Sequence, residues 1–285
     1  MGLAQALWLL GLSDWNRCRC AHATALAERA LVHAERAGDR HWRDQALALL
    51  GISALTGPDP VEEALERCAE LIERARGTRG TAALVNAYAA SLEAMRGRFD
   101  AGREKAALSH SMLQDLGRRV TAAGMCYFAA EVELLAGEPA RAEETARGAL
   151  DTLNALAETA NSAALGALLA EALVRQGRFE EAEALTETSA RAAWPDDLHA
   201  QIGWRATRAQ ALAGRGEAAR GEELAREALA MLDGADDLDL RGDALVALAT
   251  TLSGTERDAA YREALGLYEG KGNLASAERV RALVS

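Results

Sequence analysis

The segments GRFDAG (residues 97–102) and GRFEEA (residues 177–182) decide the fold of this chain of 285 residues. Each opens with a glycine that recurs along the chain, at Gly57, Gly97, Gly137, Gly177, Gly216 and Gly254. Successive glycines are separated by 40, 40, 40, 39 and 38 residues. Glycine commonly ends a helix, and a period of about 40 residues leaves room for two helices and their turns. The sequence therefore predicts an array of helical hairpins.

Small side chains occupy fixed places around these glycines. The residue seven positions before each of the last five is an alanine: Ala90, Ala130, Ala170, Ala209 and Ala247. The fifth residue after each of them is also small, and so is the residue seven positions further on: Gly102, Ala142, Ala182, Gly221 and Ala259, then Ser109, Ala149, Ser189, Ala228 and Gly266. Small residues at a crossing let two helix backbones approach closely. We therefore expect tight packing within each unit.

The composition favours the same fold class. Hydrophobic residues make up 49% of the chain and aromatic residues only 4%, so Ala, Leu and Val must supply the core, and only four prolines interrupt possible helices. We predict an all-α, right-handed α-solenoid of about seven antiparallel helix pairs, forming one domain over residues 1–285. The expected units lie at about 1–39, 40–77, 78–118, 119–158, 159–193, 197–234 and 237–272, with a capping helix at 273–285.

The two segments quoted first resemble the turn of tetratricopeptide repeats, with Phe179 in the place of the family's aromatic residue. The second unit departs from this pattern, because Gly57 opens a longer turn with two prolines and Leu71 stands at a small position. The resemblance implies that the first helix of every pair lines a concave groove. Carried over by offset from the turn glycines, it gives five polar candidates for partner contacts: Tyr127, Glu131, Glu171, Arg175 and Gln210. Structural roles compete, since Tyr127 could pack in the core and Glu171 with Arg175 could form a local ion pair.

A second resemblance covers most of the chain. It rests on four segments: GPDPVEEALERC (57–68), LEAMRGRFDAGR (92–103), GWRATRAQALAGRG (203–216) and LGLYEGKGNLASAERVRALV (265–284). These are similar to the carboxyl-terminal repeat region of large bacterial signalling proteins that also carry a nucleotide cyclase domain and an ATPase domain. The resemblance implies a scaffold role, with a protein, a peptide or upstream domains of the same polypeptide as partner.

Charge and hydropathy exclude several partners. The formal net charge of −11 opposes binding to a phosphate backbone, so we expect no nucleic acid partner. No apolar run reaches membrane-spanning length, and residues 1–12 lack the basic start and the cleavage site of a signal peptide. We therefore predict a cytoplasmic protein that does not bind a membrane.

Four scattered cysteines indicate no disulfide framework. Cys18, Cys20 and His22 form a string that suggests a metal site, but on a helix Cys18 and His22 would share a face while Cys20 points away. Cys18 also suits a turn position, because Gly11 and Ala23 then keep the offsets of the small residues. We expect neither a metal nor a cofactor.

The chain also lacks the patterns of common catalytic sites. Gly266, Gly270 and Lys271 fall one residue short of a phosphate-binding loop, and we interpret them as a helix-to-helix turn. Ser109 beside His110 has no oxyanion loop around it and is expected to pack inward. Paired carboxylates follow the turns, where they complement helix dipoles, and no enclosed pocket that would raise a carboxyl pKa is indicated. We predict that the protein is not an enzyme.

Three functions remain open at this point. The first is a protein-binding or regulatory module of a bacterial signalling protein, the second is a sensor that binds a small molecule in the groove, and the third is an enzyme of unrecognised type. The apolar segment that contains Leu3, Leu7, Trp8, Leu10 and Leu12 has no obvious covering helix, which predicts either upstream sequence or a homodimer. At the other end, Glu278, Arg279 and Arg281 indicate the polar face of a capping helix.

Overall fold

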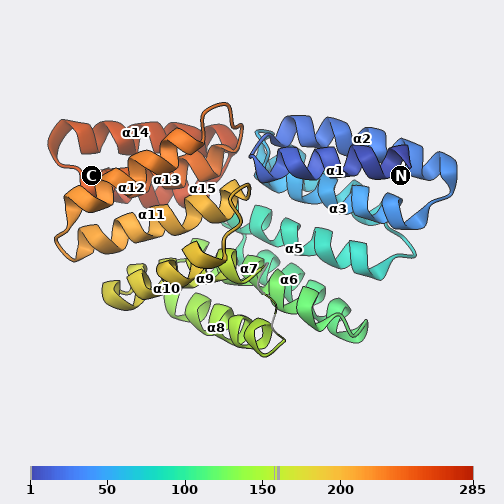
Figure 1. Ribbon diagram of the computed structural model, residues 1–285, viewed down its shortest axis with the longest axis horizontal. Coiled ribbons are helices and arrows are strands. Elements are labelled where there is room, and N and C mark those ends of the chain that lie inside the picture. The colour runs from blue at the N-terminus through green and yellow to red at the C-terminus, as the bar shows by residue number, and fades with distance from the viewer. Residues whose placement is uncertain (1, 157, 159–160, 285) are drawn as a thin grey trace.

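The computed structural model describes residues 2–156, 158 and 161–284, and within these residues every regular element is an α-helix (Figure 1). The fifteen helices are α1 Leu3–Asn16, α2 Cys20–Ala37, α3 Arg40–Thr56, α4 Val61–Arg74, α5 Arg79–Met95, α6 Phe99–Asp115, α7 Arg119–Leu135, α8 Pro139–Ala155, α9 Ser162–Arg175, α10 Phe179–Ala192, α11 Leu198–Gly214, α12 Ala218–Met231, α13 Leu238–Thr251, α14 Gly254–Lys271 and α15 Leu274–Val284. Consecutive helices pack against each other along the chain, so the predicted all-α solenoid of helix pairs is confirmed.

The turn glycines end the first helix of a pair as predicted. Gly97, Gly137, Gly177 and Gly216 have φ values of 78°, 76°, 75° and 85°, in the left-handed region that a side chain disfavours. At the first of these turns, Gly97 N donates to Ala94 O at 2.9 Å and Arg98 N donates to Glu93 O at 2.9 Å. These bonds satisfy carbonyls that the end of α5 leaves without helical partners, which is why the helix stops there.

The small residues lie where the paired helices cross. All five alanines that precede the turn glycines are fully buried. A Cβ atom added to Gly102 would lie 2.9 Å from Ala90 O, and one added to Gly221 would lie 2.6 Å from Ala209 O. Each crossing is therefore so close that a backbone carbonyl occupies the place of a side chain.

The predicted positions of the small crossing residues are wrong in one unit, the pair α13 and α14. Ala259 and Gly266, expected at the crossing of α13 and α14, are exposed, whereas Ala260 and Ala264 are buried. The cause is the turn, because α14 begins at Gly254 itself, while α6 begins two residues after Gly97. A shorter turn moves the buried face of the following helix along the sequence.

Cys18 takes the turn position between α1 and α2, as its spacing from Gly11 and Ala23 suggested. Its φ is 54°, and among the residues that the structure describes it is the one non-glycine residue with a positive φ. The side chain of Cys18 is fully buried. The premise that Cys18 shares a helix face with His22 is therefore wrong, because α2 begins only at Cys20.

The array closes on itself. In Figure 1 the last helices lie beside the first, and both α13 with α3 and α15 with α5 are in contact. Lys271 is buried at this seam, where its Nζ atom donates to Gly57 O at 2.6 Å and to Asp59 O at 2.8 Å. The carboxylate of Asp236 accepts hydrogen bonds from Cys20 N at 2.6 Å and from Ala21 N at 2.9 Å. We expected Lys271 to belong to a turn. It ends α14 instead and joins the last unit to the second.

The two ends of the chain differ from the sequence interpretation. The apolar segment in α1 does have covering helices, since α2 and α3 pack on it and bury Leu7, while Leu3 and Leu10 stay exposed. In α15 the expected polar cap face is wrong for Arg279, which lines the central cavity. Within the described residues, no helix combines the length and apolar character needed to cross a membrane.

Candidate functional site

Closure of the array forms a central cavity of about 510 Å³ that stays partly open to solvent. Its wall is built mainly by the first helices of the pairs, namely α1, α3, α5, α7, α9, α11 and α13, and α15 contributes Arg279. Because these helices come from both ends of the chain, the cavity is complete only when the seam between α1–α4 and α11–α15 is closed.

One side of the cavity is aromatic. Tyr88 of α5 and Phe128 of α7 meet edge to face with ring centroids 5.1 Å apart, and Tyr127 packs on Phe128 at 5.2 Å. Trp8 and Trp15 of α1 extend this wall, with their ring nitrogens bonded to Gln45 O at 3.1 Å and to Thr56 Oγ1 at 3.0 Å. Rings held in this way offer apolar faces to a ligand.

Carboxylates also line the wall, several of them near Tyr127. Glu131 accepts a hydrogen bond from Ser91, and Asp243 accepts one from the hydroxyl of Tyr268 at 2.5 Å. Among the described lining residues six are acidic and one is an arginine: Glu131, Glu171, Asp197, Asp237, Asp239 and Asp243, with Arg279. The cavity therefore carries an excess of negative charge.

Burial changes the proton affinity of these carboxyl groups. The pKa of Glu131 is raised to about 8, first because burial disfavours its charged form and then because Asp243, Asp239 and Glu171 lie near it. The hydrogen bond from Ser91 opposes the rise without cancelling it. At neutral pH Glu131 is thus mostly protonated, and an enclosed pocket that raises a carboxyl pKa does exist, contrary to our expectation.

Arginines hold two neighbouring carboxylates in the charged form. Burial would raise the pKa of Glu171, but Arg175, whose Nη2 atom lies 2.5 Å from a carboxylate oxygen of Glu171, lowers it below the ordinary value. The pKa of Asp243 is raised to about 6 by burial and by Glu171, and Arg279 at 3.9 Å limits the rise. Glu171 is therefore ionised at neutral pH, and Asp243 is largely so.

The structure places four of the five predicted groove residues on the cavity wall: Tyr127, Glu131, Glu171 and Gln210. The fifth, Arg175, lies behind the wall and donates to Glu171 and to a backbone carbonyl at the end of α7. The alternative of a local ion pair is thus confirmed for Glu171 and Arg175. A role in contacting a partner remains a prediction for all five residues.

Sequence reasoning missed the part of the wall that the end helices supply. Trp8 and Trp15 belong to a segment interpreted as uncovered, and Arg279 to one interpreted as a cap. Asp243 occupies a first helix, but the shorter turn at Gly254 shifts the offset that would have identified it. Counted from Gly254, the offset that identified Tyr127 falls on Ala244, one residue after Asp243.

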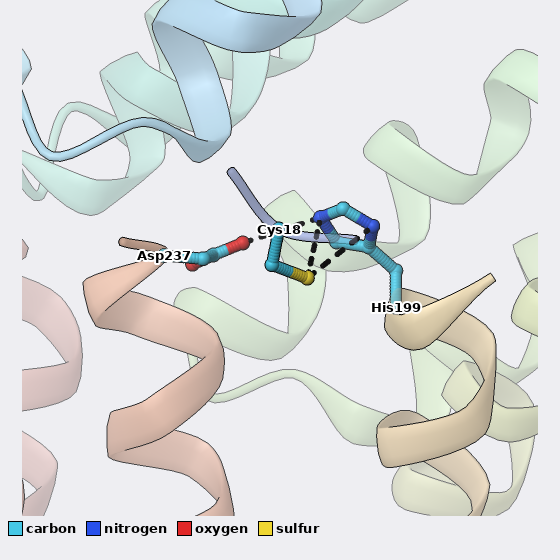
Figure 2. Close-up of side chains that lie close together, drawn as sticks. All are labelled: Cys18, His199 and Asp237. Atoms are coloured by element: carbon cyan, nitrogen blue, oxygen red, sulfur yellow. Dashed lines mark hydrogen bonds and ion pairs between the residues drawn. The ribbon is translucent and has the colours of Figure 1, made fainter. Parts of the chain in front are cut away.

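Three side chains from separate elements form a group that could hold a metal. The ligand atoms of Cys18, His199 and Asp237 all lie within 4.8 Å of one another (Figure 2). Cys18, Cys20 and His22, which the sequence suggested as a metal site, do not come together. Cys20 Sγ lies 3.3 Å from a threonine hydroxyl, and His22 pairs with Asp14 at 2.5 Å. The sequence therefore contained one of the three residues of this group, without its partners.

Comparisons with known proteins give the fold alone. No protein-family model and no curated protein matches the sequence. The structure is similar to that of a Rap protein in complex with competence and sporulation factor, with a TM-score of 0.70 at 12% identity, covering 100% of this chain and 76% of the other. The apo form of the quorum sensor NprR from B. thuringiensis gives a TM-score of 0.52 at 13% identity, covering 91% of this chain and 79% of the other. A tetratricopeptide repeat protein from Parabacteroides merdae gives 0.45 at 12% identity, covering 99% and 97% of the two chains. The first two likenesses show that the chain shares the all-helical fold of these proteins.

Proposed function

We propose that this protein is a regulatory binding module that takes a short, positively charged peptide into its central cavity. The observation that carries the proposal is the central cavity itself, whose wall combines aromatic rings with carboxylates. Its volume of about 510 Å³ falls within the range of roughly 300–1,000 Å³ that is usual for ligand pockets. A folded protein domain does not enter a space of this size, so the partner inside it is a short chain or a small molecule.

The charge of the wall selects the ligand class. The acidic side chains of the wall outnumber its one arginine, even though Glu131 is mostly protonated and Glu171 is paired with Arg175, so the cavity keeps a negative potential that attracts positive charge. The rings of Tyr88, Tyr127 and Phe128 offer faces on which a guanidinium or an ammonium group can lie. A peptide with a free amino terminus or a basic side chain satisfies both features.

Regulation follows from where the contacts lie. Trp8, Trp15 and Tyr88 come from the first third of the chain, whereas Asp243 and Arg279 come from the last third. A ligand that touches both sets binds the closed array more tightly than an open one, and so it shifts the population toward closure. A partner on the outside would then distinguish the loaded form from the empty form.

The structural neighbours support a sensing role. One was solved with competence and sporulation factor and another is described as a quorum sensor. The finer assignment, a regulatory region of a bacterial signalling protein with cyclase and ATPase domains, rests on the sequence resemblance. The peptide class rests on the cavity.

We also propose binding without chemistry. Glu131 and Glu171 have pKa values moved in opposite directions, which is the arrangement that acid–base catalysis uses. Both already have protein partners, however, since Ser91 donates to Glu131 and Arg175 pairs with Glu171. Their role is to bind a ligand, with Glu171 offering a carboxylate and Glu131 a hydrogen-bonding carboxyl group.

The test compares two sets of short synthetic peptides that differ only in carrying Lys and Arg or Asp and Glu. We expect the basic set alone to give heat of binding and to raise the melting temperature. At a ligand concentration of about a hundred times Kd, the folded state should gain about 2.7 kcal/mol of stability. Asp243→Asn, which keeps an acceptor for Tyr268, should weaken binding about tenfold or more, or about 1.4 kcal/mol.

Asp151→Asn on the exposed face of α8 is the matched control and should bind like the wild type. Equal binding of both peptide sets, or of neither, would overturn the proposal. Binding of small amine metabolites in place of peptides would support the second candidate, a sensor of small molecules, and would remove the peptide from the proposal.

A further inference from the structure

The seam of the closed array contains a cluster of three chemically different side chains, and the proposed function uses none of them as a group. Cys18 comes from the turn between α1 and α2, His199 from the first turn of α11, and Asp237 caps the start of α13 (Figure 2). Cys18 and His199 are 181 residues apart in the sequence. No local motif brings them together, so only the closure of the array does.

The distances within the cluster fit a transition metal. Cys18 Sγ lies 3.7 Å from His199 Nε2, and the same nitrogen lies 3.3 Å from Asp237 Oδ2. Zinc binds sulfur at about 2.3 Å and nitrogen or oxygen at about 2.0–2.2 Å, so tetrahedral ligand atoms stand roughly 3.3–3.7 Å apart. All the ligand atoms lie within 4.8 Å of one another, and a small side-chain rotation closes the longest separation.

The backbone at Cys18 is a second, independent observation. Seven described inter-helix turns with the same closing hydrogen bonds carry glycine at the left-handed position, and this turn carries a cysteine with a φ of 54°. Cysteine at such a φ is strained where glycine is not. Glycine would suit the turn better, so backbone geometry does not account for the cysteine. Its thiol is the property that the turn conformation leaves to be explained.

The surroundings of the other two ligands hold them in place. Asp237 Oδ1 accepts a hydrogen bond from Leu240 N at 3.0 Å, which leaves Oδ2 turned toward His199. The imidazole of His199 stacks on Trp15 with centroids 4.6 Å apart. Asp237 and Cys18 are 5% and 0% exposed, and Asp197 and Asp236 add negative charge near the thiol. Packing of this kind behind the ligands is what orients a metal site.

A nucleophilic triad would need a different arrangement. In such a triad the carboxylate bonds one ring nitrogen and the nucleophile bonds the other. Here Sγ lies 3.8 Å from Nδ1 and 3.7 Å from Nε2, and the nitrogen that faces Asp237 is also Nε2. Because Sγ is almost equally far from both ring nitrogens, the geometry is not that of a triad, and the Cys18 thiol has to turn toward Asp237 for one ion to bind all three side chains.

We propose that Cys18, His199 and Asp237 bind one divalent transition-metal ion, with zinc as the ion that fits best, and that the ion fastens the first turn of the array to its last units. His199 and Asp237 also line the cavity, so the fourth position of the ion is available to water or to a cavity ligand. The ion would stabilise the closed state, because its three ligands separate when the seam opens.

The test uses tag-free, metal-stripped full chain titrated with Co²⁺ and with Zn²⁺. We expect one Co²⁺ per chain with a thiolate-to-cobalt charge-transfer band, displaced by Zn²⁺, and a zinc-dependent rise in melting temperature. Cys18→Gly relieves the backbone and so should fold yet lose the band, and Asp237→Asn keeps the oxygen that caps α13 but should weaken binding at least tenfold.

The chain offers a matched control. Cys126 is half-buried and lies 3.6 Å from His110, so Cys126→Ser removes another thiol that neighbours a histidine. This variant should keep the band and the stoichiometry. A wild-type protein without the band, or a band that survives Cys18→Gly, would overturn the proposal. Because peptide binding is measured without metal, its failure and the failure of the metal site can be told apart.

Discussion

The middle of the array and its seam are held together by different means. From α5 to α12 the turn inside each helix pair places a glycine with positive φ, and each crossing within a pair places a buried alanine against a small residue, so the same device repeats. At the seam each kind of contact occurs once. The Lys271 ammonium donates to backbone carbonyls, the Asp236 carboxylate accepts from two backbone amides, and Cys18 lies in the cluster with His199 and Asp237. Repetition builds the wall of the cavity, and single polar contacts close it.

The largest expected effect comes from breaking the seam. Lys271→Met leaves the buried carbonyl of Gly57 without its donor and removes the bond to Asp59 O, and we expect a loss of about 3 kcal/mol in the free energy of unfolding. Urea denaturation measures this loss, and small-angle scattering should show a larger radius of gyration. Lys105→Met, at the only other lysine, is the control and should leave both quantities unchanged within error. A compact, fully stable Lys271→Met protein would show that closure does not depend on this side chain.

A smaller loss is expected from the middle. Gly102→Ala brings a Cβ atom to 2.9 Å from Ala90 O, and the required shift of α6 should cost about 1–2 kcal/mol despite the better helix propensity of alanine. Gly148→Ala on α8 meets no atom within 4 Å and should stabilise the protein by about 0.5–1 kcal/mol. The two substitutions are chemically identical, so equal effects would mean that the crossing is not tight.

The pH dependence of stability should distinguish the middle of the array, which contains Glu131, from the last units, which contain Asp243. The folded-state pKa of Glu131, about 8, exceeds its ordinary value of 4.5, so its contribution to stability is present below pH 4.5 and is lost as the pH rises toward 8. Burial and the facing carboxylates of Asp243, Asp239 and Glu171 cause this shift, against the hydrogen bond from Ser91. We expect Glu131→Gln to remove a decline on the order of 1–2 kcal/mol between pH 5 and pH 8, because cavity water reduces the full value.

Denaturation curves at several pH values provide the measurement. Asp243→Asn should flatten only the part of the decline below about pH 6, because its pKa is about 6. Glu104→Gln on the exposed face of α6 should leave the pH profile as it is in the wild type. An unchanged profile in Glu131→Gln would mean that this carboxyl group is ionised in the folded protein.

The smallest expected effect is a gain in stability from a substitution at the seam. Cys18→Gly in metal-free protein relieves the left-handed turn and should stabilise it by up to about 1 kcal/mol, whereas Gly137→Ala in the middle should lose about 1 kcal/mol. Thermal melts of both variants give the comparison. A loss on Cys18→Gly would mean that the buried thiol contributes more by packing than the backbone costs.

The sequence pattern predicts the middle of the molecule well and the seam poorly. The turn at Gly97 and the crossing at Ala90 follow from glycine geometry and side-chain size, which depend on residues close in sequence. Lys271 and Gly57 are 214 residues apart, and nothing near either position identifies the other. For the same reason four groove residues could be placed from their offsets, while Arg279 and Trp15 could not.

Closure also bears on how the protein folds. In an open repeat array each unit contacts only its neighbours, so the end units can unfold alone and folding can begin anywhere. Here the first and last helices hold each other through bonds that span more than two hundred residues, such as the one from Lys271 to Asp59. Such contacts form only after the units between them are in place, and they tie the local folding steps into one. The closed array should therefore lose its structure in a single cooperative transition, where an open array would fray from its ends.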